Sequence, residues 1–155
     1  MDTKYKNIIK RILLKKKTIS IAESFTGGLI SNEFVKFSGI SKSFICGIIA
    51  YSNESKIKLL KVKKINLKKY GAVSSSIAKE MATNIKKISK SDYSISTTGI
   101  AGPDGGTIEK PVGLVYICFK SNKKTKVIKK ILKGTRNNIQ KKSLDIVFNL
   151  LKNNI

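Results

Sequence analysis

Three stretches of the sequence end an apolar run with side chains that could do chemistry. The first is IAESFTGG, residues 21–28, where the run stops near Ser24 and Thr26 and two glycines lead into a helical pattern. A strand that enters a helix directly presents unpaired backbone N–H groups and a positive dipole end. Ser24 and Thr26 are therefore predicted to face a ligand crevice. The alternative is that Thr26 only caps the helix and Ser24 only bonds to nearby backbone.

The second stretch is AYSNESK, residues 50–56, in which polar residues again follow an apolar run. If Ser52 or Asn53 caps a helix, Lys56 falls in its first turn, where positive charge disfavours the helix. A lysine beside a helix N-terminus and other cations has a lowered pKa and can act as a base. The alternative is a solvated surface lysine. Spacing alone does not separate Ser24 from Ser52 as the reacting hydroxyl.

The third stretch is TTGIAGPDGGTIEKPVG, residues 97–113, which holds five glycines and both prolines of the chain. It matches neither a Walker A loop nor the Rossmann fingerprint, because the glycines are spaced differently and no Gly-Lys-Ser/Thr follows them. A glycine-rich loop at a strand end indicates a ligand clamp or lid. An ordinary hairpin-like connection is the alternative.

Charge and composition restrict the chemistry further. The chain carries a formal charge of +23 and has no histidine, which excludes a Ser-His-Asp triad and histidine-based zinc sites. Acid–base chemistry must then come from Lys, Tyr, Asp or Glu. The positive charge is nearly all lysine and is spread along the chain, so it favours anionic small molecules, and nucleic acid only through weak electrostatic binding.

The location of the protein is predicted from its cysteines and its apolar runs. Cys46 and Cys118 both lie in apolar segments, so no disulfide framework is expected, and a reducing cytoplasmic compartment fits best. No apolar run approaches the ~20 residues of a membrane span. Residues 1–17 read as an amphipathic helix and not as a signal peptide.

Periodicity predicts alternating strands and helices in one domain, residues 1–155. Strand patterns cover 18–22, 44–51, 93–100, 112–120 and 125–133, and helical patterns cover 5–13, 28–37, 52–62, 65–71, 74–89 and 136–154. The continuous apolar run at 44–51 is typical of a strand covered on both faces. The predicted fold is a three-layer α/β/α sandwich on a mixed, mostly parallel sheet of about five strands. The three polar stretches then share one rim of that sheet.

The motifs also resemble a known family. AESFTGG, AYSNESKIKLLKV, YGAVSSSIAKEMA, TTGIAGPDGGTIEKPVG and KGTRNNIQKKSLDIVFNLL are similar in order and spacing to the CinA C-terminal domain family, over about residues 5–152. The resemblance implies a nicotinamide-nucleotide amidohydrolase that converts nicotinamide mononucleotide to nicotinate mononucleotide and ammonia. It also implies serine catalysis without a metal or other cofactor, and a homodimer or larger assembly.

The resemblance assigns roles to individual positions. It implies Ser24 as the nucleophile with Tyr51 and Lys56 in support, and substrate binding by Thr26, Gly27, Gly28, Thr98, Gly99 and Arg136. In this mechanism Lys56 takes the hydroxyl proton of Ser24, with Tyr51 relaying the proton or orienting the groups, and backbone N–H groups near Gly27 or Gly28 hold the oxyanion. The substrate phosphate lies against helix N-terminal N–H groups and Arg136.

Two residues depart from the family pattern: Phe25 stands where Cys is usual, and Gln140 stands where a second basic residue often follows Arg136. The alternative functions are an inactive nucleotide- or partner-binding module linked to competence or DNA damage, and a DNA-binding protein.

Overall fold

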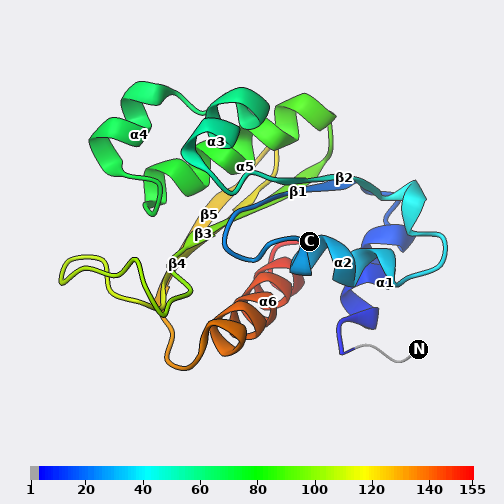
Figure 1. Ribbon diagram of the computed structural model, residues 1–155. Helices are drawn as coiled ribbons and strands as arrows, with labels where there is room; N and C mark the ends of the chain where they lie inside the picture. The colour runs from blue at the N-terminus through cyan, green and yellow to red at the C-terminus, as the bar shows by residue number, and fades with distance from the viewer. Residues whose placement is uncertain (1–3) are drawn as a thin grey trace.

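The computed structural model describes residues 4–155 and is built on one five-stranded sheet (Figure 1). The strands are β1 (Ile19–Glu23), β2 (Phe44–Ile49), β3 (Tyr93–Gly99), β4 (Leu114–Lys120) and β5 (Thr125–Ile131). Their order across the sheet is β2-β1-β3-β4-β5. β1 pairs in parallel with β2 and β3, and the β3–β4 and β4–β5 pairs are antiparallel. The sheet is therefore mixed, and its parallel part consists of the three strands that precede the polar stretches.

Helices cover both faces of the sheet, which confirms the predicted three-layer sandwich (Figure 1). One layer holds α3 (Asn53–Leu60), α4 (Lys64–Tyr70) and α5 (Ser75–Ser89). The other holds α1 (Lys6–Leu14), α2 (Leu29–Val35) and α6 (Arg136–Lys152), and a short 3-10 turn, η1 (Ile40–Lys42), precedes β2. The predicted N-terminal amphipathic helix is α1, and residues 1–3 of that prediction lie outside the described residues. No helix in residues 4–155 is long and apolar enough to cross a bilayer.

Each layer has its own core. Between the sheet and α1, α2 and α6, aromatic rings stack, with the Phe34 and Phe148 centroids 5.4 Å apart. On the other face α5 lies close to β3, because serines of the strand bond directly to helix carbonyls. Ser94 Oγ donates to Ala82 O at 2.7 Å, and Ser96 Oγ donates to Ala78 O. Burying the apolar side chains of both layers supplies the main driving force for folding.

The structure corrects one expectation about β2. The run 44–51 was expected to be covered on both faces, but β2 is an edge strand with alternating burial, and Ile45 and Ile49 are 46% and 50% exposed. The short helix α2 lies against the odd-numbered face at Gly47, where a Cβ would lie 2.3 Å from Ser31 Oγ. Position in the sheet, which an apolar run does not encode, decides this exposure.

The carboxyl ends of β1, β2 and β3 lie on one rim, as predicted. The turn into α2, the turn into α3 and the glycine-rich loop leave the sheet from these ends. The N-terminus of α6 reaches the same region after β5, so that Arg136 donates to the carbonyl of Gly102 at 2.9 Å. Four segments far apart in sequence thus converge at one place.

Candidate active site

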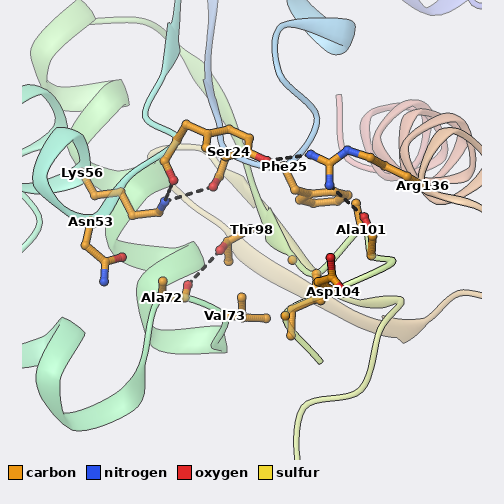
Figure 2. A pocket seen from close by; sticks show the side chains of 15 residues that line it. Ser24, Phe25, Asn53, Lys56, Ala72, Val73, Thr98, Ala101, Asp104 and Arg136 are labelled. Carbon is orange, nitrogen blue, oxygen red and sulfur yellow. Dashed lines mark hydrogen bonds between the residues drawn. The ribbon is translucent and has the colours of Figure 1, made fainter. Parts of the chain in front are cut away.

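Ser24 and Lys56 meet in the structure. Lys56 Nζ lies 3.0 Å from Ser24 Oγ, although the two residues are 32 positions apart (Figure 2). The ammonium group also donates to the carbonyl oxygens of Ala50 at 2.8 Å and Tyr51 at 3.1 Å. Lys56 is 1% exposed. Of the two interpretations of this lysine, the solvated surface residue is therefore wrong.

Burial lowers the pKa of Lys56 to about 8. Two of its three N–H positions are taken by the Ala50 and Tyr51 carbonyls, and the third is directed at Ser24 Oγ. When the amine is neutral, its lone pair takes this third position and can accept the hydroxyl proton of Ser24. The pair therefore has the geometry of a nucleophile and its general base.

Local capping explains why Lys56 points to the strand end. Ser52 is the N-cap of α3 and its Oγ accepts from the Ser55 N–H at 3.0 Å, which places Lys56 in the first turn of the helix. Ser52 is exposed and does not line the pocket. The structure thus gives Ser52 a capping role and brings Ser24 to the lysine.

Glu23 has a role in the site that was not expected from the sequence. This fully buried residue ends β1, and its carboxylate accepts five hydrogen bonds at the start of α2. The donors are Thr26 Oγ1, the N–H groups of Gly28, Ile30 and Ser31, and Ser31 Oγ, at 2.7–3.2 Å. The positive end of α2 is therefore occupied by the chain's own carboxylate and is not free for a substrate phosphate. The sequence did contain a signal for this role, because Glu23 lies five residues before Gly28, the N-cap of α2.

Thr26, Gly27 and Gly28 do not line the pocket. Thr26 Oγ1 bonds to Glu23 at 2.7 Å and to Thr97 Oγ1 at 2.8 Å. The Gly27 N–H donates to Ser24 O, and the Gly28 N–H donates to Glu23. The N–H groups of Gly27 and Gly28 themselves already have acceptors inside the turn, so a free oxyanion donor near these glycines must come from another residue of the turn.

Tyr51 and Arg136 form a second contact at the pocket. Arg136 Nη2 donates to Tyr51 Oη at 2.6 Å, and Nη1 donates to Gly102 O at 2.9 Å. Tyr51 is 57% exposed, and it touches Lys56 only through its backbone carbonyl. The predicted relay of a proton by the Tyr51 hydroxyl has no hydrogen bond to support it here. The hydroxyl holds Arg136 instead.

Thr98 and Gly99 line the pocket floor at the end of β3. Thr98 Oγ1 donates to Ala72 O at 2.8 Å and ties β3 to the segment that precedes α5. A Cβ at Gly99 would lie 2.8 Å from Val115 Cγ1 and 3.0 Å from the Phe25 ring. Gly99 is therefore required by close packing against the residue that follows Ser24.

These groups surround a pocket of about 250 Å³. Its charged lining residues are Lys56, Arg136 and Asp104, and Figure 2 shows Lys56 and Arg136 reaching it from opposite sides of Ser24. Asp104, Ala72 and Val73 also line the pocket although no pattern in the sequence pointed to them, and Asn53, expected only as a possible helix cap, lines it too. Asn53 and Asp104 stand inside motifs that were recognised, whereas Ala72 and Val73 carried no signal.

Comparison with known proteins shows to which family this chain belongs. The model of the CinA C-terminal domain matches residues 1–155. The chain belongs to the CinA C-terminal domain family. A CinA-like protein of Fusobacterium nucleatum is 53% identical over 139 residues, which cover 89% of this chain and 34% of that protein. A CinA-like protein of Kosmotoga olearia is 56% identical over 126 residues, covering 81% of this chain and 31% of that protein. The chain thus spans about a third of the length of these relatives.

Solved structures of CinA proteins share the fold. A competence/damage inducible protein CihA from Agrobacterium tumefaciens superposes with a TM-score of 0.90 at 30% identity, and the match covers 97% of this chain and 95% of that one. Competence damage-inducible protein A (ComA) from Klebsiella pneumoniae gives a TM-score of 0.93 at 23% identity, over 97% and 93% of the two chains. The CinA fold is therefore present here over nearly the whole chain.

Proposed function

We propose that this CinA-family chain is a nicotinamide-nucleotide amidohydrolase that acts by serine catalysis. The observation that carries the proposal is the buried hydrogen bond between Lys56 Nζ and Ser24 Oγ at the wall of the pocket. A structural module has no need of a buried lysine that faces a serine, since burying an ammonium group is costly. The substrate class proposed, the carboxamide of nicotinamide mononucleotide, is the one that the resemblance of the motifs to this family implies.

The proposed reaction uses Lys56 as base and then as acid. Neutral Lys56 takes the hydroxyl proton as Ser24 Oγ adds to the amide carbon, and the carbonyl electron pair moves to oxygen. The tetrahedral intermediate collapses, the C–N bond breaks, and Lys56 returns the proton so that ammonia leaves. Water then hydrolyses the ester at Ser24, releasing nicotinate mononucleotide. These steps use only side chains of the chain, a substrate and water.

Arg136 is the proposed partner of the substrate phosphate. Its guanidinium lines the pocket and donates to the Tyr51 hydroxyl and the Gly102 carbonyl, both neutral acceptors. A phosphate is a stronger acceptor than a phenol oxygen and can take the place of Tyr51. The substrate would then lie between Arg136 and the Ser24–Lys56 pair. The family resemblance also predicts a homodimer, which sedimentation of the full chain would test.

Release of ammonia from nicotinamide mononucleotide, measured with a chelator present, tests the proposal. We expect turnover by the wild type, none by Ser24→Ala, and near wild-type turnover by Ser52→Asn, which removes the competing hydroxyl but keeps a residue that can cap α3. A folded wild type that releases no ammonia would overturn the activity and leave a nucleotide-binding module. Turnover that survives Ser24→Ala but not Ser52→Asn would reverse the choice of nucleophile.

A further inference from the structure

Two backbone N–H groups follow Ser24 without an acceptor. In the turn after β1, the N–H groups of Ser24, Gly27 and Gly28 donate to Thr97 O, Ser24 O and Glu23. The N–H groups of Phe25 and Thr26, which lie between them, donate to no atom of residues 4–155. Both residues are only 3% exposed. Buried N–H groups are nearly always paired, so two consecutive exceptions beside a serine call for a ligand.

We propose that the N–H groups of Phe25 and Thr26 form the oxyanion hole and that Gln140 is the positioning residue that orients it. The proposal deepens the amidohydrolase function and rests on it for the identity of the substrate. When Ser24 Oγ bonds to the carbonyl carbon, the carbonyl electron pair becomes an oxyanion next to this turn. Backbone donors that are fixed in place and have no other acceptor can stabilise such an oxyanion without reorganising. The N–H of the residue after a nucleophilic serine has this role in other hydrolase folds.

Gln140 acts through the peptide between Phe25 and Thr26. Its Nε2 donates to the Phe25 carbonyl oxygen at 2.7 Å, across 115 positions of sequence. In a trans peptide the C=O and the N–H of one unit point in opposite directions, so a bond that fixes the Phe25 oxygen also fixes the Thr26 N–H. Gln140 thus controls a donor that it does not touch.

Other contacts hold the two ends of this peptide. At one end, the Phe25 ring packs in a buried cluster with Ala101, Val115 and Ile139, the residue before Gln140 on α6. At the other end, the Thr26 hydroxyl is held by Glu23 and Thr97. Helix α6 therefore clamps the residue after Ser24 through both its side chain and its carbonyl. Such support from surrounding residues keeps a donor within the narrow tolerance that catalysis requires.

The test compares three variants of the full chain. Gln140→Met keeps the volume but removes the donor, and Gln140→Lys supplies a donor that can reach the Phe25 carbonyl. Lys141→Met, at the neighbouring exposed position, is the matched control. For nicotinamide mononucleotide we expect Gln140→Met to lower kcat about 10- to 100-fold, somewhat less than loss of a direct oxyanion donor, with KM within about twofold. Gln140→Lys should stay within about threefold of the wild type, and Lys141→Met should match it.

A second measurement does not depend on the substrate. A fluorophosphonate phosphonylates a serine as the Oγ–P bond forms and fluoride leaves, and its P=O oxygen needs the same donors. We expect Gln140→Met to slow labelling of Ser24 about as much as it lowers kcat. If the wild type is labelled but releases no ammonia, the proposed substrate is wrong and the labelling ratio still tests the oxyanion hole.

Several outcomes would overturn the inference. They are a raised KM with unchanged kcat in Gln140→Met, equal losses in Gln140→Met and Gln140→Lys, or a wild type that is not labelled at Ser24.

Discussion

The pKa of Lys56 gives the sharpest prediction, because two independent measurements must report it. The neutral amine is the proposed base, and burial lowers its pKa to about 8 from 10.5. The neutral fraction is then about 1% at pH 6 and one half at pH 8. We expect kcat/KM for nicotinamide mononucleotide to rise about tenfold per pH unit below pH 8, about 50-fold between pH 6 and pH 8, and to level off above.

Stability must follow the same group. Below pH 8 the lysine is protonated in both the folded and the unfolded chain, and above pH 10.5 it is neutral in both. Between these values the unfolded chain binds more protons, so the free energy of unfolding rises with pH. A difference of about 2.5 pH units corresponds to about 3 kcal/mol of added stability across this window.

Urea unfolding and ammonia release between pH 6 and pH 10.5 would measure both effects. Lys56→Met should lose turnover and the Lys56 part of the rise in stability. Lys58→Met is the matched control, because Lys58 is 71% exposed and pairs with Glu54 one turn earlier on the same helix. It should behave as the wild type. A rate profile that is flat from pH 6 to pH 8, or a Lys56→Met variant whose stability rises as steeply as that of the wild type, would refute the assignment of Lys56 as a buried base.

Three further predictions concern the residues around this pair. Glu23→Gln leaves N–H groups of α2 without a charged acceptor and should lower the free energy of unfolding by about 3 kcal/mol, measured by urea unfolding; a loss below about 0.5 kcal/mol would contradict the capping role. Gly99→Ala forces a Cβ against the Phe25 ring and a backbone carbonyl, and should cost about 1–3 kcal/mol by the same assay; an unchanged free energy of unfolding would show that this packing does not require glycine. Tyr51→Phe frees Arg136 from its phenol partner and should change KM while kcat stays within about threefold, since Lys56 does not contact that hydroxyl; a loss of kcat of a hundredfold would restore the proton relay.

The motifs predicted the central part of the site. A serine and a lysine were each placed after an apolar strand, and parallel strands bring their carboxyl ends to one rim. The structure joins Ser24 to Lys56 at 3.0 Å in this way. Local preference offered Ser52 or Asn53 as the cap of this helix, and the structure places the cap at Ser52, which sets the direction of Lys56.

Other parts of the site depended on contacts that motifs do not show. The glycines after Ser24 were interpreted as ligand contacts, whereas their N–H groups are used within the turn and by Glu23. Gln140 was noted only as a departure from the family, and its bond to the Phe25 carbonyl is a contact between residues 115 positions apart. Spacing along the chain carries no information about which backbone groups remain free after packing.

The sequence by itself determined the alternation of strands and helices, the absence of histidine chemistry, and the placement of a serine and a lysine just after apolar strands. These follow from local periodicity and residue type, which depend on near neighbours. Only the tertiary structure decided that β2 is an edge strand, that Lys56 loses its water, and that the α2 dipole is used by Glu23. Each of these is fixed by the burial of groups distant in sequence, because desolvation and pairing depend on what surrounds a group in space.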